Sequence, residues 1–152
     1  MTYAVGIMSG TSLDGVDVAL VDIENNYELV DFKSYSFESE MKEKIKQSLA
    51  KETSDVELIC SLNFELGYIF GEAVVKICEA NNINSGDLAF VASHGQTVYH
   101  HPKEGGGLVP STLQIGESSV ISEVTKTDVV SDFRYRDMAV GGQGAPIVPY
   151  SE

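Results

Sequence analysis

The chain has no tryptophan, two cysteines, four prolines and only ten basic residues in 152 positions. The scarcity of basic residues excludes whole classes of partner, because 23 acidic residues leave a net charge of −13 that opposes binding to nucleic acids and anionic membranes. Disordered and fibrous classes are also excluded, since 43% of the residues are apolar and 22% are charged. The composition predicts one globular domain with small-molecule partners.

The sequence also lacks long apolar runs and a pair of cysteines placed to form a disulfide. We expect no segment long and apolar enough to span a membrane, and residues 1–3 lack the basic region that begins a signal peptide. Cys60 and Cys78 are 18 positions apart in one expected helix, too far for a disulfide, so both are interpreted as reduced core thiols. These absences predict a cytoplasmic protein without membrane association.

Alternating and short apolar runs predict an α/β domain with a mixed sheet flanked by helices. A capping box at Ser54 and Glu57 is expected to start the longest helix, which ends before Asn81. Residues 132–152 have the composition of a loop. The other expected elements, in chain order, are strands at 2–8, 16–23 and 27–37, a helix at 39–50, strands at 88–92 and 112–115, a helix at 117–124 and a strand at 128–131.

The first polar segment that could carry chemistry is MSGTSLDGVD at residues 8–17, between two expected strands. Its glycines can adopt positive φ, and a turn that does so directs successive backbone N–H groups at phosphate oxygens. Asp14 and Asp17 could hold a magnesium ion through water. A hairpin that bonds only its own backbone has equal weight as an alternative. The P-loop and nucleophile-elbow patterns do not match.

The second segment, SHGQTVYHHP at residues 93–102, follows the expected buried strand at 88–92. Ligands bind at the carboxyl ends of strands in open α/β sheets, so His94 and Gln96 are candidate substrate contacts. All three histidines lie here, but neither cysteine nor an HExxH pattern accompanies them, which leaves zinc as the weaker interpretation. His100 and His101 are expected in a solvated turn.

The third segment, SDFRYRDMAVGGQGAP at residues 131–146, contains both arginines of the chain. A planar guanidinium binds carboxylate or phosphate with two hydrogen bonds, so Arg134 and Arg136 predict an anion site. Asp132 and Asp137 leave open the alternative of a surface ion-pair network. Residues 141–144, three of them glycines, are expected to be mobile or to lie close against a ligand.

Together with TLQIGESSVI at residues 112–121, these segments closely resemble the anhydro-N-acetylmuramic acid kinases of bacterial cell-wall recycling. The phosphate-loop segment is shared with the wider actin, hexokinase and glycerol kinase superfamily, whereas HGQT and DFRxxDxAxGGQGAP are specific to this family. The resemblance covers essentially the whole chain. It implies a ribonuclease-H-like (actin-like ATPase) fold, in which residues 1–152 are the N-terminal lobe of a two-lobe sugar kinase and the second lobe is absent from this chain.

The resemblance also implies a reaction. Water opens the 1,6-anhydro ring of anhydro-N-acetylmuramic acid while the freed O6 accepts the γ-phosphoryl group of ATP, giving N-acetylmuramic acid 6-phosphate and ADP. The implied cofactors are ATP and Mg²⁺, the implied partners are the sugar and the nucleotide, and a homodimer is left open. The family's base is an aspartate whose motif is expected beyond Glu152, so no catalytic residue is assigned.

The implied site residues form two groups. Asp14 is expected near the magnesium-phosphate cluster, where it would hold the metal through water. The expected ATP-binding residues are Gly10, Thr11, Ser12, Leu13, Asp14, Gly15, Val16 and Asp17. The residues expected to face the sugar are His94, Gln96, Arg134 and Asp137.

Two rival functions belong to other classes. A non-catalytic actin-like nucleotide-binding module would keep residues 10–17 but would not need His94 or the arginine segment. A glycosidase would use paired carboxylates such as Asp14 and Asp17, and it would open the sugar ring without ATP.

Overall fold

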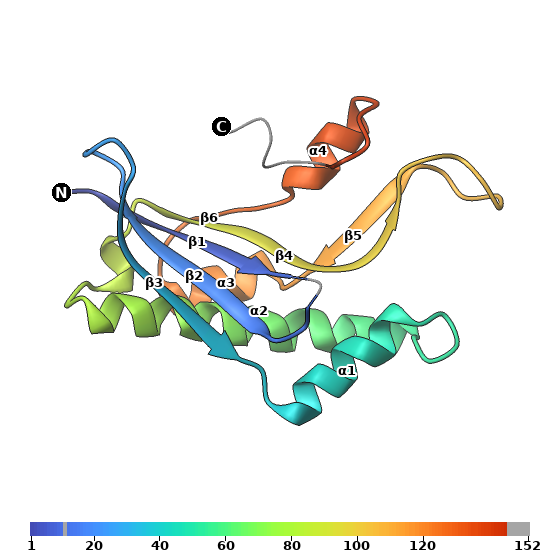
Figure 1. Ribbon diagram of the computed structural model, residues 1–152, viewed down its shortest axis with the longest axis horizontal. Helices are drawn as coiled ribbons and strands as arrows, with labels where there is room; N and C mark the ends of the chain where they lie inside the picture. The colour runs from blue at the N-terminus through green and yellow to red at the C-terminus, as the bar shows by residue number, and fades with distance from the viewer. Residues whose placement is uncertain (11, 146–152) are drawn as a thin grey trace.

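One mixed sheet joins the strands of the molecule (Figure 1). The computed structural model describes residues 1–10 and 12–145. The strand order is β3-β2-β1-β4-β5, and β6 pairs with the start of β4. The strands are β1 (Tyr3–Ser9), β2 (Gly15–Asp22), β3 (Glu28–Ser36), β4 (Phe90–His101), β5 (Ser111–Ile115) and β6 (Val129–Val130). Because β1 is antiparallel to β2 but parallel to β4, the predicted mixed sheet and its opening meander are confirmed.

Helices cover the two faces of this sheet unequally (Figure 1). The helices are α1 (Ser39–Leu49), α2 (Val56–Ala80), α3 (Ser118–Thr125) and α4 (Phe133–Ala139). The first three lie on one face, and within the described residues α4 is the helix on the other. The sequence of β2 explains the difference, because Val16, Val18 and Leu20 alternate and are fully buried, whereas Asp17 and Ala19 between them turn toward the side of α4.

The core helix is α2. It begins at Asp55, whose Oδ1 accepts a hydrogen bond from the backbone N–H of Leu58 at 2.7 Å, so the predicted capping box at Ser54 and Glu57 is misplaced by one residue. By length and composition α2 could also cross a membrane, contrary to our expectation that no segment could, although a core helix passes the same test. The side chains and glycines that it buries are Leu62, Leu66, Gly67, Phe70, Gly71, Ala73, Val74, Ile77 and Cys78.

Two glycines of α2 allow α3 to approach closely. A Cβ at Gly67 would lie 2.9 Å from Cβ of Val120, and one at Gly71 would lie 2.8 Å from Cβ of Val124. Because residues four apart share one face of a helix, the two glycines form a single groove that receives α3.

The two cysteines of α2 lie in different surroundings. Both are free thiols, but Cys78 is buried and Cys60 is exposed, so the interpretation as core thiols is right for Cys78 and wrong for Cys60. Burial raises the pKa of the Cys78 thiol to about 11.

The strand predicted at residues 88–92 is in fact the first part of a twelve-residue strand, β4. Ile7 of β1 pairs with Ser93 and Ser9 pairs with Gln96, so β4 carries one extra residue at this point and forms a bulge. Gly95 makes the bulge, with a φ of +78°. Beyond it β4 continues against β5, which places His100 and His101 in the strand and not in the predicted solvated turn.

The segment predicted as loop after residue 132 contains the short helix α4. Its end is a Schellman motif: the N–H of Gly142 donates to the Asp137 carbonyl at 2.9 Å, and the N–H of Gly141 donates to the Met138 carbonyl at 3.0 Å. Gly141 has the positive φ, +96°, that this motif requires. The glycines at 141 and 142 therefore end a helix of seven residues, which the sequence pattern did not predict.

Candidate functional site

The loop between β1 and β2 turns at Leu13 and not at its glycines. Leu13 has a φ of +58°, and its N–H donates to the Gly10 carbonyl at 3.3 Å. Neither Gly10 nor Gly15 adopts positive φ, so the predicted glycine-built nest is wrong in this detail. Thr11, an expected ATP contact, lies outside the described residues.

Side chains along this loop alternate between the core and the solvent. Leu13 and Val16, two of the expected ATP-binding residues, are buried, and their side chains anchor the loop to the core, which leaves their backbone as the part that can contact a nucleotide. Gly15 is required by a close neighbour, since a Cβ there would lie 2.0 Å from the Tyr35 carbonyl oxygen of β3. Ser12 and Asp14 are exposed on either side of Leu13.

The outward side chains of the loop fit a hydrated magnesium ion and phosphate oxygens. Asp14 is exposed, and its carboxylate has no hydrogen-bond partner among residues 1–10 and 12–145. The Asp17 carboxylate is also exposed, and its Oδ1 accepts a hydrogen bond from Ser34 Oγ at 2.6 Å. Mg²⁺ binds carboxylate oxygens, directly or through water. Of the Asp14 and Asp17 carboxylates, only that of Asp17 is hydrogen-bonded to another side chain within the described residues.

Two of the predicted sugar-facing residues form a direct pair. Arg134, on α4, donates from Nε to Nε2 of His94, on β4, at 2.8 Å. Nδ1 of the same imidazole lies 2.8 Å from the Gly95 carbonyl oxygen, so it carries the proton and Nε2 is the acceptor. The bulge at Gly95 thus fixes the tautomer that can receive the arginine.

The surroundings of His94 favour its neutral form. Burial lowers the pKa of His94 below its ordinary value, the nearby Arg134 charge lowers that pKa further, and the bond to the Gly95 carbonyl partly opposes both effects. A neutral imidazole is the form that accepts from Arg134, so the electrostatics and the hydrogen bonds agree.

Asp137, the third predicted sugar-facing residue, reaches the same arginine through the backbone. Oδ2 of Asp137 accepts from the Gly144 N–H at 2.8 Å, and the Gly144 carbonyl accepts from Nη1 of Arg134 at 2.7 Å. A Cβ at Gly142 would lie 2.2 Å from Oδ2 of Asp137, so this turn closes tightly over the carboxylate.

The alternative of a surface ion-pair network is not what this segment forms. Within residues 1–10 and 12–145, the salt bridges involve the N-terminus and lysines but neither Arg134 nor Arg136. Arg134 is partly buried and bonded to a neutral ring and a carbonyl, so its positive charge is not neutralised by a carboxylate within hydrogen-bonding distance in the described part. Such an arginine is suited to receive an anionic ligand.

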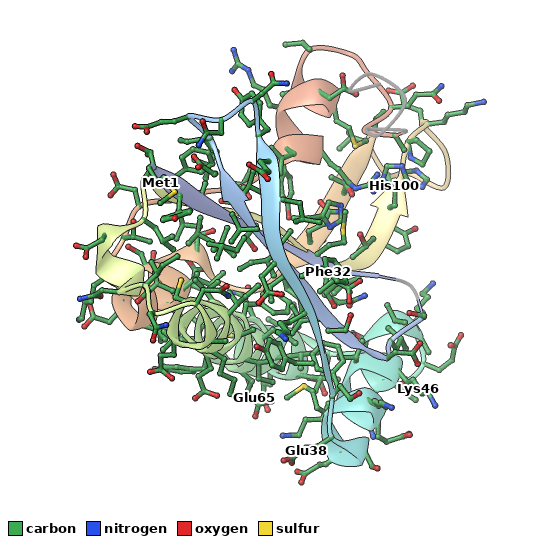
Figure 2. The ribbon with its side chains drawn as sticks, turned by 60° about the vertical axis from the view of Figure 1, so that its left-hand side comes forward. Met1, Phe32, Glu38, Lys46, Glu65 and His100 are labelled. Atoms are coloured by element: carbon green, nitrogen blue, oxygen red, sulfur yellow. The ribbon has the colours of Figure 1, made fainter. Side chains whose placement is uncertain are left out.

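An open cleft of about 600 Å³ lies between α4 and the exposed face of the sheet. Small residues of three strands and larger apolar side chains line it, with Asp17, His94 and Arg134 as its polar residues. Phe32 of β3, labelled in Figure 2, is one of the apolar residues. The remaining residues of the lining are Gly6, Ile7, Met8, Ala19, Ala92, Phe133 and Ala145. The structure thus brings one residue of the nucleotide group together with two of the sugar group.

Gln96 does not join this cleft. Its side chain is 1% exposed, and its Oε1 accepts from Ser9 Oγ at 2.5 Å. Because the bulge at Gly95 shifts the alternation of β4, Gln96 turns inward and ties the end of β1 to β4. The prediction that Gln96 faces a sugar is not supported by this position.

Sequence reasoning missed the residue that holds α4 on the sheet. The hydroxyl of Tyr135 accepts from the Gln114 N–H at 2.7 Å and donates to the Gln114 carbonyl at 3.0 Å, so it occupies the free edge of β5. Burial raises the pKa of Tyr135 above its ordinary value. An aromatic residue between two arginines was the available signal, since Tyr buries its ring and needs a partner for its hydroxyl.

Known proteins match the chain across nearly its whole length. A family model described as anhydro-N-acetylmuramic acid kinase matches residues 2–152. Among curated relatives, the anhydro-N-acetylmuramic acid kinases of Bacillus thuringiensis subsp. konkukian (strain 97-27) and Bacillus cereus (strain G9842) are each 54% identical over 155 residues. Each match covers 99% of this chain and 41% of the relative, so the chain spans about two fifths of the length of these relatives. Because the family model matches residues 2–152, the chain belongs to the anhydro-N-acetylmuramic acid kinase family.

Proposed function

We propose that this chain supplies the phosphate loop and part of the sugar site of an ATP-dependent kinase for anhydro-N-acetylmuramic acid. Water adds to C1 of the 1,6-anhydro sugar as the bond from C1 to O6 breaks, and O6 takes the γ-phosphoryl group of ATP. The products are N-acetylmuramic acid 6-phosphate and ADP. The observation that carries the proposal is the Arg134–His94 pair in a cleft that Asp17 also lines, in a chain 54% identical to proteins named for this kinase activity.

On the nucleotide side, the proposal assigns Ser12 and Asp14 to the phosphates. Mg²⁺ bound with ATP would neutralise charge that develops on the transferred phosphoryl group. Asp14 would hold the ion through water, and Ser12 would offer a hydroxyl donor to phosphate oxygens. The buried side chain of Leu13 supports these roles because it fixes both neighbours with their side chains outward.

On the sugar side, Arg134 would bind the carboxylate of the lactyl group. Its Nε and Nη1 already have protein partners, and its other N–H groups have none within the described residues. Hydrogen bonds at Nε and Nη1 fix the plane of the guanidinium, so its remaining N–H groups, on Nη2 and Nη1, are presented in a fixed orientation that suits a carboxylate. His94 would keep that orientation, and the apolar lining of the cleft would receive the less polar parts of the sugar.

We further propose that the fold is a ribonuclease-H-like lobe of the actin type, with residues 1–152 as the N-terminal lobe of a two-lobe kinase. The antiparallel run β3-β2-β1 beside the parallel pair of β1 and β4 supports this assignment. The second lobe would close over the loop at residues 10–14, and the cytoplasmic location remains a prediction.

The test is product analysis with the complete protein, anhydro-N-acetylmuramic acid, ATP and Mg²⁺. We expect N-acetylmuramic acid 6-phosphate and ADP in equal amounts, measured by mass spectrometry and by a coupled ADP assay. Ring opening in the absence of ATP would favour a glycosidase instead. ATP binding without any turnover of the sugar would favour a non-catalytic nucleotide-binding module.

A further inference from the structure

We propose that Asp137 is a positioning residue, which acts on a ligand only by fixing the guanidinium of Arg134 through the turn at Gly144. This role replaces the predicted direct contact between Asp137 and the sugar. It rests on the proposed function for its kinetic consequence, whereas its structural consequence can be measured independently.

Two side chains of α4 hold the two backbone polar groups of Gly144. Asp137 Oδ2 accepts from its N–H at 2.8 Å, and Arg134 Nη1 donates to its carbonyl at 2.7 Å. Arg134 and Asp137 are three positions apart on α4, so they lie on one face of the helix and both form hydrogen bonds with the turn from that side.

The geometry of the turn leaves little freedom for another arrangement. Gly144 has a φ of +70°, and a Cβ there would lie 3.0 Å from Cγ of Met138. Gly142 has no room for a Cβ beside the Asp137 carboxylate. Oδ2 of Asp137 is therefore held by the turn, in a direction set by Gly144 and not by a ligand.

The second anchor of Arg134 is His94, and the two anchors together fix the plane of the guanidinium. One hydrogen bond would leave the side chain free to rotate, whereas bonds from Nε and Nη1 to partners on β4 and on the turn define both its position and its tilt. Loss of Asp137 removes the support of one anchor without touching the other, so the effect should reach His94 through Arg134.

The pKa of His94 therefore distinguishes a positioning role of Asp137 from a purely structural one, because a purely structural residue would not change it. Besides Arg134, the charged group that lines the cleft with His94 is Asp17. The Arg134 charge lowers the pKa of His94, so an arginine that swings away should let that pKa rise toward its ordinary value. NMR titration of the His94 ring nitrogens in the complete protein measures this shift whether or not the kinase reaction has been demonstrated.

The experiment compares Asp137→Ala with Asp137→Asn and, as a charge-matched control on the flank of α4, Asp132→Asn. We expect Asp137→Ala to raise the pKa of His94 and to lower kcat/KM for the anhydro sugar by about tenfold or more, since one hydrogen bond to a charged group is lost. Asp137→Asn keeps an oxygen acceptor for the Gly144 N–H, so it should retain most of both properties, and Asp132→Asn should change neither.

If Asp137→Ala fails to fold, Gly144→Ala disturbs the same turn from its other side and should give the same rise in the His94 pKa. An unchanged His94 titration in a folded Asp137→Ala or Gly144→Ala protein overturns the proposal. So does a loss of kcat/KM in Asp137→Asn equal to that in Asp137→Ala, because a direct charge contact with the sugar predicts that result. Absence of any kinase activity in the unsubstituted protein would count against the proposed function alone, and the titration would still decide this inference.

Discussion

A single arginine illustrates how residue type controls the site. Arg134 has its Nε and Nη1 bonded to His94 and to the Gly144 carbonyl, at 2.8 and 2.7 Å, while a lysine offers one ammonium that cannot reach two partners in fixed directions. The other arginine, Arg136, is exposed two positions later and serves as its natural control.

We therefore predict that Arg134→Lys in the complete protein lowers kcat/KM for anhydro-N-acetylmuramic acid by about tenfold to a hundredfold, which corresponds to about 1.5–3 kcal/mol of charged hydrogen bonding. Steady-state kinetics measure it. Arg136→Lys should have wild-type kinetics. The loss should shrink for the anhydro sugar without a lactyl group, and an equal loss on both sugars would contradict the carboxylate assignment.

Asp14 can be substituted without loss of buried contacts. It is exposed, has no hydrogen-bond partner for its carboxylate in the described residues, and follows the anchored Leu13, so its removal should not disturb the core. We expect Asp14→Asn to reduce kcat by roughly a hundredfold or more, about 3 kcal/mol, because charge stabilisation around the transferred phosphoryl group is lost.

The melting temperature of the Asp14→Asn protein should match that of the wild type. Glu104→Gln, an exposed change in the β4–β5 connection, is the control for loss of one negative charge. Normal turnover of Asp14→Asn would mean that Asp14 is only a turn residue.

At the scale of elements, the connection from β5 to α3 depends on Gly116. Its φ is +120°, and a Cβ there would lie 2.4 Å from Cε2 of Phe70 in the core of α2. Asn63 of α2 holds the same connection, since its Oδ1 accepts from the Gly116 N–H at 2.8 Å and its carbonyl accepts from the Glu117 N–H at 2.9 Å. Backbone conformation and packing thus both require glycine here.

We predict that Gly116→Ala lowers the free energy of unfolding by about 3 kcal/mol, from backbone strain and overpacking against Phe70 together. Urea denaturation followed by circular dichroism measures the change. Gly105→Ala is the matched control, because nothing lies within 4 Å of its Cβ position and its φ is not left-handed, so its stability should stay close to wild type. Equal stabilities of the two variants would show that the connection relaxes freely.

Elements with strong apolar patterns were predictable from the sequence, and those made by longer-range constraints were not. The spacing of apolar residues in β2 and α2 indicates which side chains are buried, and both elements lie near their expected bounds. The second part of β4 is polar, and its pairing with β5 depends on the bulge at Gly95. The helix α4 has seven residues, too few to establish a helical period.

The same distinction applies to the candidate site. The sequence grouped His94 with Arg134 by resemblance, but their hydrogen bond joins residues 40 positions apart and depends on where α4 lies on the sheet. Gln96 is a candidate sugar contact because it follows the carboxyl end of an expected buried strand, yet the extra residue in β4 turns its side chain into the core. The local sequence pattern indicates which residues have suitable chemistry, whereas the register of the strands decides which way their side chains point.

For the whole molecule, the two faces of the sheet differ in how much they are covered. One face packs on α1, α2 and α3, while the other carries only α4 in the described residues (Figure 1). Met8 and Phe32 on this second face are 44% and 52% exposed. The cleft that Arg134 and His94 line opens on this less covered face. A kinase needs nucleotide, sugar and water held together from more than one side.

A polypeptide of these 152 residues, produced by itself, should fold but should not phosphorylate the sugar. Its buried core around Phe70, Leu20 and Val91 and its continuous sheet favour independent folding, which cooperative thermal unfolding by circular dichroism would show. We expect at most weak ATP binding by calorimetry and no product from the anhydro sugar, because Ser12 and Asp14 face solvent and the relatives that carry the named activity are more than twice as long. The complete protein, assayed in parallel with the same substrates, is the control for active reagents. Micromolar ATP affinity or measurable phosphorylation by the 152 residues would show that the phosphate loop and the Arg134–His94 pair suffice without a second lobe, and the two-lobe mechanism proposed for this family member would then be wrong.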